Sequence, residues 1–151
     1  MLFSSAIGAG AFIWWATALI AGIFPNKRAA AWRMLLAVGF TFAISDWILK
    51  PMFNRPRPYQ VDTTIAVIEG KPDTQAFPSG HAAMAVAGAI AGARLIPYSA
   101  WFWWPLAAIV ALSRIYIGVH WPTDVVAGAL LGVATAWFVL GGKSVRQRAG
   151  H

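Results

Sequence analysis

Long apolar runs alternate along the chain with short polar connections. Crossing the hydrocarbon core of a bilayer takes roughly 20 apolar residues. Runs of about this length lie at Phe3–Phe24, Ala29–Leu49, Gly80–Ile96, Ala100–Gly118 and Pro122–Leu140. Each run is too long and too continuously apolar for a half-buried strand. The pattern therefore predicts an all-α fold, a polytopic membrane helix bundle with about five transmembrane helices, which forms a single domain over residues 1–151.

The composition favours the same class of protein. Hydrophobic residues make up 59% of the chain, charged residues make up 11%, and the mean hydropathy is too high for an ordinary soluble domain. The absence of cysteine excludes disulfide scaffolds, thiolate metal sites and cysteine nucleophiles. No basic segment precedes the first apolar run, so we expect a retained membrane helix there and no signal peptide.

The formal net charge of +7 is distributed unevenly between the two ends of the predicted bundle. One end carries only basic residues, namely Lys27, Arg28, Arg33, Arg94, Lys143, Arg146 and Arg148. At the other end, equal numbers of basic and acidic residues cancel. Positive charge marks the cytoplasmic side, so we expect a multi-pass protein of the cell (inner) membrane with its N-terminus outside and its C-terminus cytoplasmic. The asymmetry is a topology signal, and no nucleic-acid partner is expected.

A first polar cluster opens the long outer connection between Lys50 and Ser79. Lys50 closes the second helix and Arg57 follows seven residues later, with prolines that stiffen the segment into an extended form. Two cations at a fixed spacing can converge on one anion. Asp46 lies one helical turn before Lys50 and is expected to hold its ammonium group. On its own, the cluster is equally compatible with a snorkelling lysine and solvated arginines.

A second cluster, Pro-Ser-Gly-His, opens the third helix. Ser79 has the character of a helix N-cap, and free N–H groups at a helix start bind phosphate. Gly80 allows an anion to approach the backbone, and His81 can give or take a proton near neutral pH. Taken alone, the same residues are compatible with a plain N-cap and an incidental histidine.

A third cluster lies between the fourth and fifth helices. Gly118 and Pro122 indicate that one helix ends and another begins there, so His120 falls in the turn. Asp124 can reach back to the imidazole, fix its tautomer and leave the other ring nitrogen free to attack. Arg114 supplies a planar cation suited to phosphate. The alternative for this cluster alone is that its polar groups merely pair with one another.

The predicted topology brings all three clusters to the outer membrane face. There, the cations, two helix N-termini and two histidines would form one oxyanion pocket. No transition metal is implied, because His81 and His120 would need Asp124 as a third ligand, crowded by arginines. The chain is therefore expected to use no metal and no other cofactor.

Together, the clusters resemble the type 2 phosphatidic acid phosphatase (PAP2) superfamily. Its pattern is Lys-x6-Arg-Pro, then Pro-Ser-Gly-His, then Ser-Arg-x5-His-x3-Asp, and all three parts are intact and in order here. The resemblance implies a metal-independent phosphatase in which His120 attacks phosphorus and Asp124 orients it. It implies that His81 protonates the leaving oxygen and activates the water that cleaves the phosphohistidine. The phosphate-binding residues implied are Lys50, Arg57, Ser79, Gly80 and Arg114.

The resemblance also sets expectations about architecture. Membrane members of the family typically have six helices, so this chain, with five, is expected to start at the family's second helix. Five membrane helices disfavour the soluble branch, which includes vanadate-dependent haloperoxidases. Homo-oligomer formation and the lateral route of a lipid into the site are left open.

These observations predict a lipid phosphatase that acts at the outer membrane face. A polyprenyl diphosphate of cell-wall carrier recycling, such as undecaprenyl diphosphate, is the first choice of substrate. Phosphatidate or phosphatidylglycerol phosphate comes next, and a polyprenyl-linked sugar phosphate third. The alternative is a non-enzymatic transporter or binding protein for anionic lipids, which would need the cations but not the His120–Asp124 pair. The intact motifs disfavour a catalytically dead scaffold.

Overall fold

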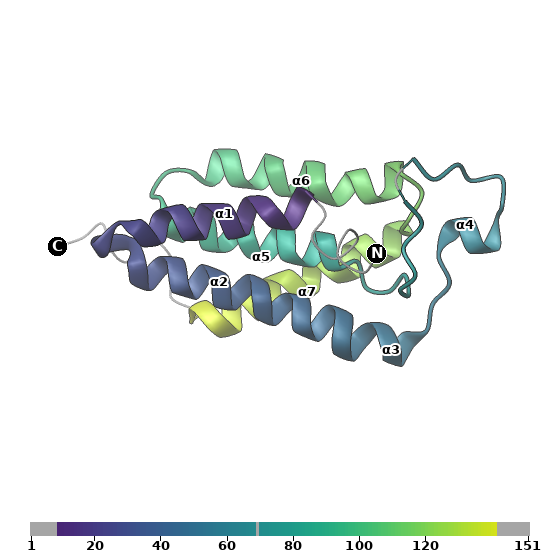
Figure 1. Cartoon of the computed structure of the whole chain (residues 1–151), viewed down its shortest axis with the longest axis horizontal. Helices are drawn as coiled ribbons and strands as arrows, with labels where there is room; N and C mark the ends of the chain where they lie inside the picture. The colour runs from purple at the N-terminus through teal and green to yellow at the C-terminus, as the bar shows by residue number, and fades with distance from the viewer. Residues whose placement is uncertain (1–8, 69, 142–151) are drawn as a thin grey trace.

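Long helices lie side by side along one axis in the computed structural model, which describes residues 9–68 and 70–141 (Figure 1). They are α1 (Ala9–Ile23), α2 (Arg28–Ala43), α5 (Gly80–Leu95), α6 (Ala100–Tyr116) and α7 (Pro122–Leu140). The shorter elements are a 3₁₀ turn η1 (Pro25–Lys27), a π-helical turn η2 (Ile44–Leu49), α3 (Lys50–Phe53) and α4 (Pro58–Val61). The described residues contain no strand, and the all-α prediction is confirmed.

The predicted boundaries of α5, α6 and α7 are right to within two residues. The predicted start of the first helix at Phe3 lies outside the described residues. The second helix runs on through η2 into α3, so the prediction of an extended segment beginning at Lys50 is wrong. Pro51 lies directly after the π-helical turn η2 in this continuous helical stretch. The chain leaves the helix at Asn54, in the left-handed conformation (φ 40°), and is extended at Arg57.

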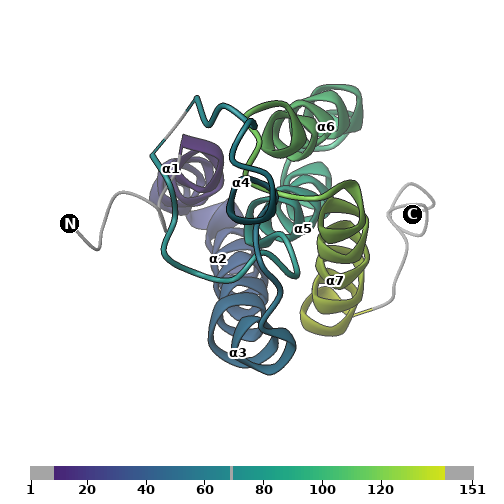
Figure 2. The same ribbon diagram turned by 90° about the vertical axis from the view of Figure 1, so that its right-hand side faces the viewer.

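Helix α5 is the centre of the bundle and packs against α1, α2, α6 and α7 (Figure 2). Alanine and glycine make up most of it, and most of its residues are buried. A Cβ atom on Gly128 or Gly132 of α7 would lie 2.3 Å from the carbonyl oxygen of Ser79 or Ala83, respectively. The backbones of α5 and α7 are therefore in direct contact, as the four-residue glycine spacing predicts.

Gly88 and Gly92 in α5 have the same four-residue spacing, which predicts another close approach of a helix backbone, but the structure differs from this prediction. A Cβ atom on Gly88 would lie 2.3 Å from the Trp14 ring, and one on Gly92 would lie 2.9 Å from the Trp103 ring. These glycines therefore make room for two indoles instead of a helix backbone. The two rings contact each other, with centroids 5.4 Å apart, and both belong to the main hydrophobic core.

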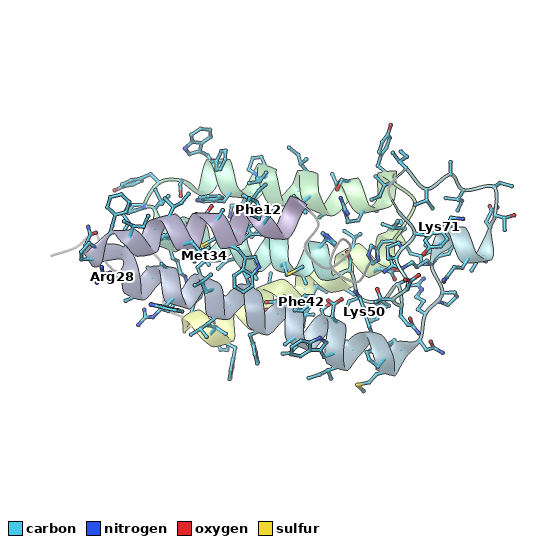
Figure 3. All side chains as sticks on the ribbon, viewed as in Figure 1. Phe12, Arg28, Met34, Phe42, Lys50 and Lys71 are labelled. Atoms are coloured by element: carbon cyan, nitrogen blue, oxygen red, sulfur yellow. The ribbon has the colours of Figure 1, made fainter. Side chains whose placement is uncertain are left out.

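By length and composition, two helices of the described chain can cross a membrane, the helical stretch Pro25–Val61 and α7. Helices α5 and α6 have 16 and 17 residues, or about 24–26 Å at 1.5 Å per residue, which is shorter than a hydrocarbon core of about 30 Å. Five membrane crossings therefore stay a prediction. Figure 3 shows Arg28 at one end of the bundle and Lys50 and Lys71 at the other, the ends to which the predicted topology assigns them.

Candidate active site

The three motifs meet at one end of the bundle. Lys50 begins α3, Arg57 precedes α4, and Arg114 lies in the last turn of α6. Ser79, Gly80 and His81 form the start of α5, while His120 and Asp124 lie at the start of α7. The charges of Lys50, Arg57 and Arg114 all lie within electrostatic range of His81. Segments up to about seventy positions apart in the sequence therefore come together, as predicted.

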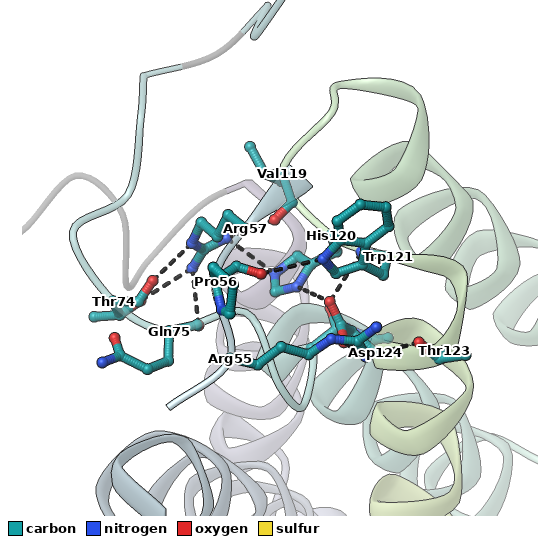
Figure 4. A network of polar contacts seen from close by, with 12 residues as sticks. Arg55, Pro56, Arg57, Thr74, Gln75, Val119, His120, Trp121, Thr123 and Asp124 are labelled. Atoms are coloured by element: carbon teal, nitrogen blue, oxygen red, sulfur yellow. Dashed lines mark hydrogen bonds and ion pairs between the residues drawn. The ribbon is translucent and has the colours of Figure 1, made fainter. Parts of the chain in front are cut away.

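His120 occupies the turn between α6 and α7 and is only 4% exposed (Figure 4). Its ring Nδ1 lies 3.7 Å from Asp124 Oδ2, and its Nε2 lies 3.4 Å from Arg57 Nη1. Its backbone N–H donates to the carbonyl of Arg114 at 3.2 Å. The imidazole is thus held between a carboxylate on one side and a guanidinium on the other.

Asp124 is fully buried in the first turn of α7, where it serves as a helix cap as well as a partner of His120. Its Oδ2 accepts a hydrogen bond from the backbone N–H of Trp121 at 2.9 Å. The predicted contact between Asp124 and His120 is present, with the carboxylate beside the Nδ1 side of the ring. A hydrogen bond would need a shorter approach than 3.7 Å, and within the described chain His120 Nδ1 has no hydrogen-bond partner.

Arg57 is almost completely buried, with 2% exposure. Its Nη1 donates to the carbonyl of Val119 at 2.9 Å, its Nε to the carbonyl of Thr74 at 2.7 Å, and its Nη2 to Thr74 Oγ1 at 3.0 Å. Neutral oxygens therefore fix the guanidinium plane without cancelling its charge. Such a preorganised cation beside His120 is suited to an incoming oxyanion.

Lys50 forms the predicted salt bridge with Asp46, one turn earlier in the same helical stretch. Asp46 also contacts the start of α5, because a Cβ atom on Gly80 would lie 2.7 Å from Asp46 Oδ2 and 3.1 Å from Ser45 Oγ. Gly80 therefore leaves room at a helix N-terminus for a carboxylate, the kind of group that the N–H groups there favour. The sequence predicts that a phosphate binds beside Gly80. In this structure, the Asp46 carboxylate lies beside Gly80.

Ser79 is the predicted N-cap of α5, and its Oγ accepts a hydrogen bond from Ala82 N at 3.4 Å. Its own backbone N–H donates to the carbonyl of Asp124 at 2.9 Å. This second bond ties the start of α5 to the start of α7. The two motifs that carry the histidines are therefore held in a fixed relation by backbone contacts.

The surroundings of His120 decide which form of its ring prevails. Burial lowers the pKa of the imidazole below its ordinary value of 6.5, and the charges of Arg57 and Lys50 lower it further, against the opposing effect of Asp124. The ring is therefore neutral near pH 7, and one of its nitrogens keeps a lone pair. A neutral, oriented imidazole is the form that can act as a nucleophile.

Sequence reasoning missed Arg55, which it used only in the balance of charge. Arg55 Nη1 donates to Asp124 Oδ1 at 2.7 Å and to Thr123 Oγ1 at 2.8 Å. No local pattern in the sequence marks Arg55 as the partner of a residue 69 positions away. As for metals, the described residues include no group of three or more His, Cys, Asp or Glu side chains that could hold an ion.

Residues 30–148 match the family model of the PAP2 superfamily. The chain belongs to the PAP2 superfamily. This PAP2 chain is 34% identical over 124 residues to the undecaprenyl-diphosphatase of Sulfolobus acidocaldarius, a match that covers 80% of this chain and 59% of that protein. It is 32% identical over 140 residues to the decaprenylphosphoryl-5-phosphoribose phosphatase of Mycobacterium tuberculosis, a match that covers 90% of this chain and 75% of that protein.

The fold of this chain is shared with a solved structure. The crystal structure of Aquifex aeolicus LpxE superposes with a TM-score of 0.75 at 25% identity, over 87% of this chain and 81% of that one. The resemblance that the three motifs indicate is therefore confirmed, and the chain is a membrane protein of this family. The roles of individual site residues stay predictions.

Proposed function

We propose that this PAP2 protein is an integral-membrane lipid phosphatase that works through a phosphohistidine intermediate. The observation that carries the proposal is the position of His120, with Nδ1 toward Asp124 and Nε2 toward Arg57. A nucleophilic imidazole needs a carboxylate at one nitrogen and its target at the other. A protein that only binds or transports anionic lipids has use for the arginine but none for this pair.

In the first step, His120 Nε2 attacks the phosphorus of the lipid headgroup. The N–P bond forms as the P–O bond to the leaving oxygen breaks, and His81 gives that oxygen a proton. Asp124 holds the ring and stabilises the positive charge that it gains. Phosphoryl transfer depends mostly on positioning and charge stabilisation. We assign the binding of the phosphoryl oxygens to Lys50, Arg57, Ser79, Gly80 and Arg114.

In the second step, water attacks the phosphohistidine. The N–P bond breaks, His81 takes the proton from the water, and inorganic phosphate leaves. His81 suits both proton transfers because its Nε2 is buried and, within the described chain, has no hydrogen-bond partner. The lipid product is an alcohol when the substrate is a monophosphate, and a monophosphate when the substrate is a diphosphate.

We infer that the substrate is a polyprenyl diphosphate, with phosphatidate or phosphatidylglycerol phosphate next and a polyprenyl-linked sugar phosphate third. The Sulfolobus relative is named for undecaprenyl diphosphate and the Mycobacterium relative for a decaprenyl-linked phosphoribose, so both act on polyprenyl phosphates. The positive-inside rule supports a cytoplasmic location for the end with Arg28. The catalytic end then faces outward, with the N-terminus outside and the C-terminus inside.

A phosphate-release panel with purified protein in detergent tests this function. The substrates are undecaprenyl diphosphate, a polyprenyl-linked sugar phosphate, phosphatidate and phosphatidylglycerol phosphate, all with excess EDTA. We expect turnover of at least one of them, and a loss of at least about 10⁴-fold in His120→Asn, because the nucleophile is removed. An alkaline denaturing quench with ³²P-labelled substrate should trap a labile phosphohistidine in the wild type only.

Two results would refute the phosphatase mechanism: turnover that depends on added Mg²⁺, or turnover that persists in His120→Asn. Thermal unfolding of His120→Asn is the control for folding. If no lipid is hydrolysed and no phosphoenzyme forms, while labelled lipid moves between vesicles that contain the protein, the transport alternative is favoured.

A further inference from the structure

Arg55 lies in the segment before α4, and its side chain extends to the start of α7. Its Nη1 contacts Asp124 Oδ1 at 2.7 Å and Thr123 Oγ1 at 2.8 Å, and its guanidinium lies over the Trp121 ring, 5.7 Å from the centroid. Its carbonyl accepts a hydrogen bond from Ala76 N at 2.9 Å. Both the backbone and the side chain of Arg55 are therefore held in place.

We propose that Arg55 is a positioning residue, which clamps the Asp124 carboxylate so that the His120 imidazole is held ready for attack. This inference rests on the proposed phosphatase function and adds a residue to its machinery. It assigns Arg55 no contact with the substrate. Figure 4 shows Arg55 on the Asp124 side of the imidazole and Arg57 on the opposite side.

The two oxygens of Asp124 have separate partners. Oδ1 is bound by Arg55, while Oδ2 accepts from Trp121 N and faces His120 Nδ1. The bond to Arg55 therefore fixes the rotation of the carboxylate, and with it the oxygen that the imidazole meets. Because Asp124 is fully buried, its charge also needs a counter-ion that a neutral histidine does not supply.

The clamp is anchored at the rim of the site. The side chain of Arg55 is 37% exposed, whereas Asp124 is fully buried. Beside it, Trp121 Nε1 donates to the carbonyl of Pro56 at 3.1 Å, and Arg57 reaches the carbonyl of Val119. Three successive residues of one segment thus contact the turn and first residues of α7. We infer that this segment sets the position of the His120–Asp124 pair.

Loss of Arg55 should change the proton affinity of His120 as well as its position. The charged and titratable groups that face His120 come from the segment around α3 and α4, from α5 and from α7; they are Lys50, Arg57, His81 and Asp124. Without Arg55, the negative charge of Asp124 acts on the imidazole without a counter-ion. His120 then binds a proton more readily, and the acid limb of the pH–activity profile moves to higher pH.

The test compares Arg55→Gln, Arg55→Lys and the control Lys71→Gln in the full chain, with undecaprenyl diphosphate or the best substrate of the panel. We expect Arg55→Gln to lower kcat by up to about 100-fold, the cost of a misplaced catalytic group, with KM almost unchanged and the acid limb moved upward. Arg55→Lys keeps the charge and should restore the acid limb. Lys71→Gln removes a cation from the same end of the bundle and should behave as wild type.

A rise in KM with kcat unchanged in Arg55→Gln would overturn the proposal, because Arg55 would then bind substrate. An unmoved acid limb would also overturn it. Histidine ¹⁵N NMR without substrate is the second readout, in which Arg55→Gln should raise the pH at which His120 titrates. If the wild type hydrolyses no lipid, the phosphatase function fails and the NMR titration still decides the clamp. If Arg55→Gln does not fold, Arg55→Lys is the remaining test. An acid limb of Arg55→Lys at a different pH from that of the wild type would then overturn the proposal.

Discussion

Two helices begin in the active site, and each brings a histidine, but they hold it differently. At the start of α5, His81 lies within the helix, next to Gly80, and its Nε2 has no hydrogen-bond partner among the described residues. At the start of α7, His120 precedes the helix, and its ring lies between Asp124 and Arg57.

The two surroundings suit the two histidines to different chemical roles. A ring held between a carboxylate and a guanidinium presents a lone pair in one direction, as a nucleophile requires. His81 Nε2, which has no hydrogen-bond partner among the described residues, can exchange a proton with whatever binds beside it. Environments that separate two titratable groups in this way mark the division of catalytic labour.

The largest effect that tests this comparison is expected from His81→Asn. Turnover of a lipid substrate should fall by about 10² to 10⁴-fold, the usual contribution of a general acid or base. The leaving group of p-nitrophenyl phosphate needs no proton, so His81→Asn should still form the phosphohistidine from this substrate. Hydrolysis of the phosphohistidine by water should be lost. Phosphohistidine should therefore accumulate, as measured by an alkaline quench with ³²P-labelled substrate.

The matched control for this experiment is His151→Asn, which removes a histidine outside the three motifs and should leave the rate unchanged. The roles assigned to the two histidines are wrong if His81→Asn forms no phosphoenzyme from either substrate while His120→Asn still forms it. In that case, the roles of the two histidines would be reversed.

A smaller effect is expected where the two helix starts meet. In Gly128→Ala, the new Cβ would lie 2.3 Å from the Ser79 carbonyl oxygen, so α7 must move away from α5. Overpacking of this kind costs about 1–3 kcal/mol, and it should also lower activity because Asp124 moves with α7. The free energy of unfolding in detergent is the measurement.

Gly22→Ala is the control for this change, since its Cβ would meet Ala31 Cβ at an ordinary 3.8 Å. It should keep or slightly raise stability, as alanine does in a helix where there is room. Equal stability of the two variants would mean that the contact between α5 and α7 is not as close as described.

The smallest effect concerns pH. Because burial lowers the pKa of His120, the unfolded chain binds a proton below about pH 6.5 while the folded chain does not. The free energy of unfolding should therefore fall as the pH drops below 6.5, down to the pKa of the folded state, and it should gain nothing from His120 at higher pH. The slope of stability against pH should flatten in His120→Asn; an equal slope in both proteins would place the titration elsewhere.

Much of this architecture could be predicted from the sequence because its signals are local. Apolar runs, capping residues and proline positions predict the helices, and the i, i+4 spacing predicts the pair of Lys50 with Asp46. The position of Asp124 in the first turn after His120 predicts their contact. The spacing of Gly128 and Gly132 predicts a close approach of another helix backbone. Each of these features depends on residues within a turn or two of one another.

What could not be predicted depends on contacts between distant segments. The bond between Arg55 and Asp124 joins residues 69 positions apart, and no local pattern separates Arg55 from a solvated arginine. The same limit hid Trp14 and Trp103, whose rings fill the space beside Gly88 and Gly92. Asp46 beside Gly80 was also hidden, because the π-helical turn η2, in which Asp46 lies, has no clear sequence signature.

The central helix α5 has a consequence for how this protein tolerates change. Its alanines are chemically plain, yet Ala82, Ala83, Ala85, Ala87 and Ala89 are completely inaccessible to solvent. Four other helices pack around this one narrow rod, so a single added methylene on it pushes several neighbours outward at once. Random mutagenesis should therefore find these inconspicuous alanines among the least replaceable positions in the chain, while the large aromatic residues on the outer surface should accept other apolar residues.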